Sequence, residues 1–101
     1  MTQRTERNPV STVERTFDIV EYLREVETAT LTEVTGALDI AKSTAHRHLR
    51  TLEHRGYVVR EGEAFTLGMR FLDHGYFVRR RDAAYGLARE KVEALAEQTD
   101  E

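Results

Sequence analysis

A short run of basic and hydroxyl side chains carries most of the chemistry that this sequence offers. The run consists of Lys42, Ser43, Thr44, His46, Arg47 and Arg50. Arginine can fork onto the paired acceptors of guanine, and serine or threonine can reach phosphates or base edges. No acidic residue lies between positions 43 and 50, whereas an ordinary solvated helix face usually mixes both signs of charge. The composition is therefore typical of a surface that contacts double-stranded DNA.

The overall charge of the chain hides this local excess of positive charge. The 101 residues carry a formal net charge of −3, and 33% of them are charged. Positions 39 to 60 hold five basic and two acidic residues, a net charge of +3, whereas positions 82 to 101 hold two basic and six acidic residues, a net charge of −4. Because local charge steers DNA more than the total does, the first of these segments is suited to nucleic acid.

A helix over about residues 43–55 would gather these side chains on one face. The residues predicted to point inward are Ala45, Leu49 and Leu52, which recur at helical spacing. The opposite face then carries Ser43, Arg47, Arg50 and His54, flanked by Thr44, His46 and Thr51. We expect Ser43 to cap the start of this helix. Gly56 is expected to end it, as glycine commonly does just past a helix C-terminus.

Two helices are predicted before it. The first should run from Ser11 to about Glu25, because Ser11-Thr12-Val13-Glu14 has the pattern of a capping box. Its expected inward face is Val13, Phe17, Val20 and Leu23. A second, short helix should begin at Thr32 as its N-cap. Its inward residues would be Val34 and Leu38, and a turn over residues 39–42 would join it to the third helix.

The pattern beyond Gly56 changes from helical to extended. Tyr57–Arg60 and Ala64–Leu67 are rich in β-branched and aromatic residues, and Glu61-Gly62-Glu63 separates them, which predicts a β-hairpin closed by Gly68. A short helix, a tight turn, a second helix and a hairpin form a winged helix-turn-helix, whose second helix lies in the major groove. We therefore expect a mainly α fold with a small β-hairpin over residues 11–68, after a flexible lead of residues 1–10.

One or two linker helices are predicted over residues 69–101. The apolar pattern from Met69 stops at Arg79–Arg81 and resumes from Asp82, so the arginine run is either a solvated helix junction or a DNA contact. The large apolar residues of this segment are Phe71, Leu72, Tyr76, Phe77, Val78, Tyr85, Leu87, Val92 and Leu95. A small winged core cannot cover them all. We expect a homodimer through Met69 onward, with the first helix as a second candidate surface; the alternative is packing on a further domain.

Other chemistries find little support. The absence of cysteine excludes disulfides and thiolate metal sites. His46 and His48 are two residues apart and do not face each other on a helix, so we expect no metal site, and His48 should be packed or partly buried. We find neither a glycine-rich phosphate loop nor a nucleophile elbow, so we expect neither catalysis nor a cofactor. No apolar run reaches the roughly 18 residues of a membrane span, so we expect a cytoplasmic protein without membrane association.

Several stretches resemble the IclR family of transcription regulators. They are Val13-Glu14-Arg15, Leu31-Thr32-Glu33-Val34, Ala41-Lys42-Ser43-Thr44-Ala45-His46-Arg47-His48-Leu49, Leu52-Glu53-His54-Arg55-Gly56-Tyr57-Val58, and Phe65-Thr66-Leu67-Gly68. The segment from Leu87 to Thr99 is similar to that family's linker. The resemblance implies a homodimer that binds roughly palindromic operators. It also implies a C-terminal domain, absent from residues 1–101, that would sense a small-molecule effector in the parent protein.

The sequence departs from the family pattern at a few positions. Ala41 stands where proline is frequent, and Asp39 where glycine is frequent. His48 occupies a position that is usually apolar. At the tip of the wing, Glu61 and Glu63 would repel phosphates, so we expect the wing to contribute weakly, or Arg60 alone to contact the DNA backbone.

Two functions remain open from the sequence. The first is sequence-specific DNA binding as a homodimer, with Arg47, Arg50, Ser43, Thr44 and His46 at base edges or nearby phosphates and with Lys42 and Arg60 on the backbone. The second is a protein-interaction or dimerisation module, since winged helices also serve as docking domains and a fold does not determine a function. A docking module would carry exposed apolar anchors on the third helix, whereas the predicted outer face carries none.

Overall fold

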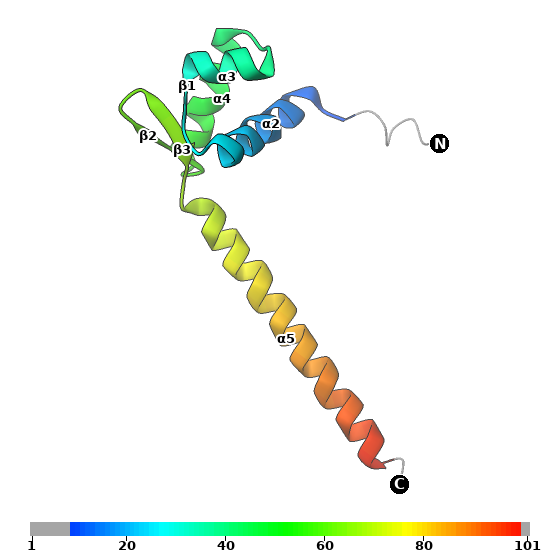
Figure 1. The fold of residues 1–101 in the computed structure, drawn as a ribbon. Coiled ribbons are helices and arrows are strands. Elements are labelled where there is room, and N and C mark those ends of the chain that lie inside the picture. Colours follow the sequence, from blue (N-terminus) through cyan, green and yellow to red (C-terminus); the bar gives the residue numbers. More distant parts are fainter. Residues whose placement is uncertain (1–8, 100–101) are drawn as a thin grey trace. The chain divides into compact units, whose positions relative to one another are not determined.

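A computed structural model of the chain describes residues 9–99, and their side chains up to residue 97. Most of the predicted lead, residues 1–8, lies outside the described residues. The chain forms two compact units, Met1–Met69 and Arg70–Glu101. The elements of the first unit are α2 (Ser11–Val26), β1 (Ala29–Thr30), α3 (Leu31–Leu38), α4 (Lys42–His54), β2 (Val58–Glu61) and β3 (Ala64–Leu67) (Figure 1). The second unit consists of α5 (Arg70–Thr99). The predicted winged helix-turn-helix architecture is confirmed.

The core of the first unit draws on every one of its elements. Its buried residues are Ile19, Leu23, Ala29, Val34, Ala45, Leu49, Leu52, Val58 and Phe65. The inward face predicted for the third helix is therefore confirmed in α4, and Val34 is buried in α3 as expected. Leu38 is only partly buried, against the rim of this core.

The inward face predicted for the first helix was partly wrong. Leu23 is buried and Val20 packs against the core, but Val13 and Phe17 are 49% and 57% exposed, and Ile19 takes the central position. Helix α2 carries two neighbouring apolar stripes, and spacing alone does not distinguish which of them meets α3 and β3. The exposed stripe remains available to a partner.

The helix starts also differ from the predictions. Ser11 is the first helical residue of α2 and forms no side-chain cap; the Glu14 amide donates instead to the carbonyl of Val10, at 3.0 Å. The capping box occurs in α3, where the Thr30 amide donates to the Glu33 carboxylate (2.8 Å) and the Glu33 amide donates to the Thr30 hydroxyl (3.2 Å). Thr30, and not Thr32, is thus the N-cap. Its extended backbone also pairs with Ala64, which sets the start of α3.

The third predicted helix has nearly the expected bounds. Helix α4 begins at Lys42 with Ala41 as its N-cap and no side-chain cap, so the predicted cap at Ser43 was wrong by two residues. At the other end Gly56 adopts a φ of 85°. The amide of Gly56 donates to the Glu53 carbonyl (3.1 Å) and that of Tyr57 to the Leu52 carbonyl (2.9 Å). This pair of bonds is a Schellman motif and explains why the helix ends there.

The predicted hairpin is present and belongs to a three-stranded antiparallel sheet in the order β1-β3-β2. Val58 pairs with Leu67 and Glu61 with Ala64, so β2 lies one residue later than predicted and the turn is only Gly62-Glu63. Strand β1, which pairs Ala29 with Phe65, was not predicted because two residues give no usable period. The sheet closes one end of the core and sets the wing beside α4.

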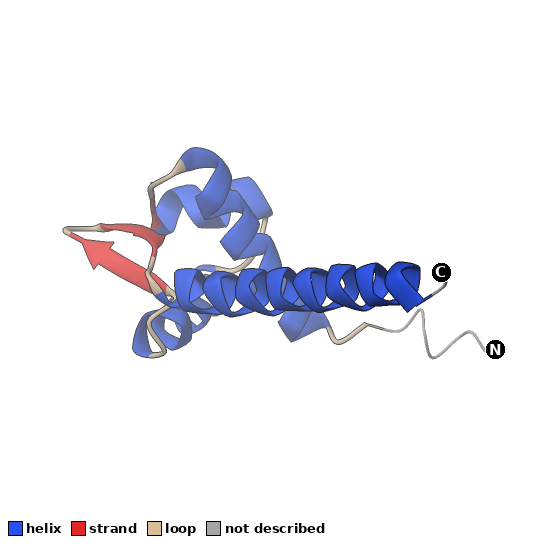
Figure 2. Ribbon diagram, turned by 90° about the horizontal axis from the view of Figure 1, so that it is seen from below, coloured by secondary structure: helices blue, strands red, loops and turns tan. Residues whose placement is uncertain are grey.

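The second unit is one unbroken helix, so of the one or two linker helices expected, one forms, and it continues through Arg79–Arg81 (Figure 2). Arginine has a high helix propensity, and the only proline is Pro9, so a lapse in the apolar pattern does not interrupt the backbone hydrogen bonds. The arginine run is therefore not a helix junction. Among the described residues, no helix is long and apolar enough to cross a membrane.

Candidate nucleic-acid interface

Helix α4 presents the predicted polar face to solvent. Ser43, His46, Arg47 and Arg50 are exposed, and Thr44 is half-buried at the edge of this face. The helix carries one acidic residue, Glu53, in its last turn. The face is fixed by burial of the opposite side, since Ala45 and Leu49 have no exposed surface and Leu52 is 7% exposed. A helix held in this way projects short polar groups and two guanidinium groups outward.

The cations of this face are not neutralised by neighbouring carboxylates. The ion pairs in the described part of the chain join Arg60 to Glu53, Arg81 to Asp82, and Arg89 to Glu93. None of them involves Arg47 or Arg50. Their positive charge is therefore directed to solvent, where an anionic partner could approach.

Lys42 and Arg60 lie on either side of a groove between the first turns of α4 and the wing. The groove is lined by Thr30, Leu31, Thr32, Lys42, His46, Arg60, Glu63 and Phe65. The guanidinium of Arg60 lies 5.0 Å from the centre of the Phe65 ring and 3.6 Å from the Glu53 carboxylate. Arg60 is thus held on the wing by two contacts, although its side chain remains 42% exposed. Glu63 lowers the positive potential of the groove.

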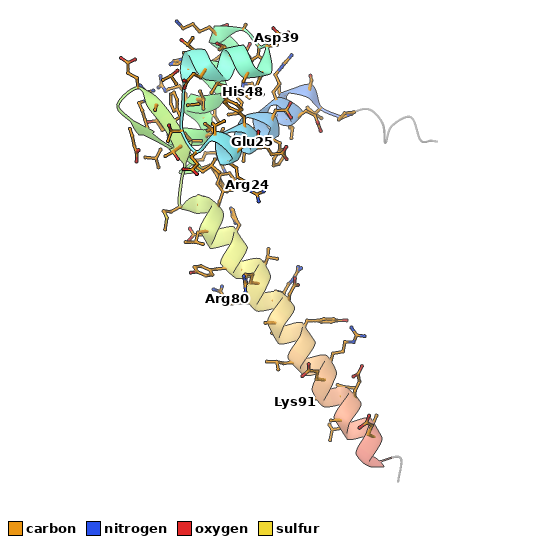
Figure 3. The ribbon with its side chains drawn as sticks, in the orientation of Figure 1. Arg24, Glu25, Asp39, His48, Arg80 and Lys91 are labelled. Carbon is orange, nitrogen blue, oxygen red and sulfur yellow. The ribbon has the colours of Figure 1, made fainter. Side chains whose placement is uncertain are left out.

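His48 is half-buried between α4 and α2, which confirms its predicted place at the edge of the inward face (Figure 3). Its Nδ1 lies 2.9 Å from the Thr44 carbonyl oxygen of its own helix. Its Nε2 lies 3.3 Å from the Thr12 carbonyl oxygen in the first turn of α2. The ring therefore lies between the two helices, and a neutral ring donates its one N–H to one of the two carbonyls.

The sequence pattern indicates no role for Arg15 beyond its place in a family motif. It is exposed on α2 and lines a groove with Arg47 of α4. Thirty-two positions separate the two arginines, so no spacing rule could have joined them. Only the packing of α2 on α4 brings them to one surface. In the residues that the structure describes, no group of three or more His, Asp or Glu side chains is arranged to hold a metal ion.

Comparison with known proteins agrees with this geometry. The family model of the IclR helix-turn-helix domain matches residues 12–62. The chain is 32% identical over 91 residues to a probable HTH-type transcriptional regulator ArcR of Halobacterium salinarum, covering 89% of this chain and 35% of that protein. It is 34% identical over 82 residues to the HTH-type transcriptional regulator KdgR of Escherichia coli, covering 72% of this chain and 31% of that protein.

A solved structure shares the fold. The crystal structure of an IclR transcriptional regulator from Alicyclobacillus acidocaldarius superposes with a TM-score of 0.64 at 28% identity, covering 67% of this chain and 29% of that one. The chain thus spans about a third of the length of these relatives. With its helix-turn-helix and wing in place, the chain belongs to the IclR family of helix-turn-helix transcription regulators.

Proposed function

We propose that this chain is the DNA-binding part of a transcription regulator and that it binds a roughly palindromic operator as a homodimer. The observation that carries the proposal is the exposed face of α4, which combines two unpaired arginines with hydroxyl groups and has no carboxylate before Glu53. A helix with such a face, supported by a wing, fits the major groove, where arginine recognises guanine.

Each predicted site residue has a role in this proposal. Arg47 and Arg50 read base edges, while Ser43, Thr44 and His46 contact base edges or the adjacent phosphates. Lys42, at the start of α4, holds a backbone phosphate, and the positive end of the helix dipole adds to its effect. Arg60 is the only wing cation placed for a backbone contact, and its bond to Glu53 weakens it as a phosphate ligand.

The homodimer is supported by the pattern of α5. Phe71, Val78, Tyr85 and Val92 recur every seven residues. Ala88 and Leu95 lie three residues after Tyr85 and Val92, respectively, which gives the alternating three- and four-residue spacing of a coiled coil. Tyr85, Val92 and Leu95 are each more than 60% exposed on the helix. The exposed stripe of α2, Val13 and Phe17, provides a second apolar surface.

In-vitro selection of the purified chain against random duplex DNA would test the proposal. We expect enrichment of a palindrome whose half-sites lie about one helical turn apart, together with a steep fall in affinity as salt rises. Binding only at low salt without an enriched sequence would contradict sequence-specific recognition. That result would favour the alternative function, a protein-interaction or dimerisation module.

A further inference from the structure

A second basic surface adjoins the exposed face of α4 and lies between α4 and α2. It is a groove lined by Thr12, Arg15, Thr16, Thr44, Arg47, His48, Thr51 and Leu52. Seven of these eight residues bear a hydroxyl, an imidazole or a guanidinium, and none is acidic. Because it contains two arginines and no carboxylate, such a lining favours an anion.

The two guanidinium groups come from different helices. Arg15 belongs to α2 and Arg47 to α4, and neither takes part in the ion pairs of the described residues. Guanidinium groups match phosphate oxygens with parallel hydrogen bonds, and such charge-assisted bonds are stronger than neutral ones. A phosphate on the Arg15 side of the groove would thus find a charge of opposite sign that no carboxylate of the described residues neutralises.

The walls of the groove are held in place by bonds within the protein. The His48 ring lies between the carbonyl oxygens of Thr44 (2.9 Å) and Thr12 (3.3 Å), and a neutral ring donates its one N–H to one of them. The hydroxyl of Thr16 donates to the Thr12 carbonyl (2.9 Å), and that of Thr51 donates to the Arg47 carbonyl (3.0 Å). The contact between His48 and Thr12 joins the first turn of α2 to α4, while the two threonine bonds lie within one helix each. The first turns of the two helices therefore lie together, and Arg15 is presented beside the exposed face of α4.

We propose that this groove holds a phosphate of the DNA backbone, with Arg15 of α2 as the phosphate contact and Arg47 as the opposite wall, free to reach a base edge. The inference rests on the proposed function. It adds a contact from α2 to the DNA backbone that does not depend on the base sequence. A duplex that receives α4 in its major groove brings a sugar-phosphate strand along the flank of that helix. Phosphate contacts of this kind set the register and orientation of the protein on the duplex.

The test compares Arg15→Gln with Arg24→Gln in the full chain. Arg24 is also exposed on α2, but nine residues later and on roughly the opposite side of the helix, where it lies with Glu21 and Glu25 (Figure 3). Both variants remove one positive charge, so the pair separates a local contact from a change in net charge. Affinity is measured by fluorescence anisotropy from about 50 to 200 mM salt, on a selected duplex and on a mixed-sequence duplex.

Arg15→Gln should weaken binding to both duplexes by about threefold to tenfold near 0.1 M salt and should lower the salt slope by about 0.9, the value for one phosphate contact. Arg24→Gln should leave both quantities unchanged, and Arg15→Lys should retain most of the slope because it retains the charge. Equal behaviour of the two glutamine variants, while Arg47→Ala loses affinity, would overturn the groove but leave DNA binding intact. A wild-type chain that binds no duplex would overturn both proposals.

Replacing single phosphates by uncharged methylphosphonates locates the contact. One position of the selected duplex should weaken the wild type and have no effect on Arg15→Gln, because the two changes remove the same interaction. If every methylphosphonate that weakens the wild type weakens Arg15→Gln equally, then Arg15 contacts none of those phosphates. This second readout remains valid if Arg15→Gln lowers the stability of the fold slightly.

Discussion

Arg47 lies where two proposed contact surfaces meet: the face of α4 that would read bases and the groove that would hold a backbone phosphate. It is exposed on the polar face and also lines the groove toward α2. If it forks onto a guanine, Arg47→Ala should cost about 1–3 kcal/mol of binding free energy and relax the preference at one base pair. Selection repeated with the variant would measure that preference directly.

Arg55→Ala provides the matched control for this prediction. Arg55 is exposed at the C-cap of α4, eight residues after Arg47, and is not among the residues proposed to contact the duplex; its removal changes the net charge by the same amount. We expect its selected sequence to be that of the wild type. A uniform loss of affinity across all sequences in Arg47→Ala would show that Arg47 contacts phosphate and reads no base.

His48 contributes to stability through the helices that it joins. His48→Ala removes both ring contacts and leaves a gap between α2 and α4, so the free energy of unfolding should fall by about 1–2 kcal/mol. His46→Ala, two residues away and exposed, should change it by less than about 0.5 kcal/mol. Urea unfolding followed by circular dichroism compares the two. Equal effects would mean that the bridge seen at 2.9 and 3.3 Å adds no stability.

At the level of elements, Gly68 fixes the junction between β3 and the end of α4. A Cβ at this position would lie 2.5 Å from the Gly56 carbonyl oxygen, while the Gly68 amide donates to the Tyr57 carbonyl at 2.8 Å. Gly68→Ala should therefore destabilise the first unit by more than about 1 kcal/mol, because the backbone must shift. Thermal unfolding would reveal this as a lower midpoint.

The same substitution at Gly36 should have the opposite effect on stability. It lies inside α3, where an added Cβ meets nothing within 4 Å. Gly36→Ala should stabilise the domain by about 0.5–1 kcal/mol, since alanine has the higher helix propensity. If both variants shifted the midpoint in the same direction, the close approach at Gly68 would not be what decides its effect.

The elements that could be predicted are those with a local signal of their own. Helix α4 was located to within about one residue because its inward residues repeat at helical spacing and Gly56 stops it. The capping box was expected at Ser11 but formed at Thr30, where pairing in the sheet already holds the backbone extended. Strand β1 and the partnership of Arg15 with Arg47 depend on packing between distant segments, so no window of sequence contains them.

The whole molecule combines a basic recognition segment with an acidic C-terminal segment. Residues 39–60 carry +3 and residues 82–101 carry −4, so the net charge of −3 conceals a segment suited to DNA. The acidic part of α5, from Asp82 onward, is unsuited to a phosphate backbone, so we expect protein contacts there. A pair of recognition helices on one duplex requires such a contact, because palindromic half-sites mirror the two-fold axis of a dimer.

The seven-residue repeat of α5 makes the dimer testable with one pair of variants. Val92 lies on the repeat and is 65% exposed, whereas Leu87, also aliphatic and 61% exposed, lies off it. Light scattering at tens of micromolar should give the wild type twice its 11.7 kDa mass. Val92→Glu should shift the mass toward the monomer because a carboxylate would be buried at the seam, and Leu87→Glu should leave the dimer intact. A monomeric wild type would contradict self-association through α5, and an equal loss in both variants would contradict the proposed seam.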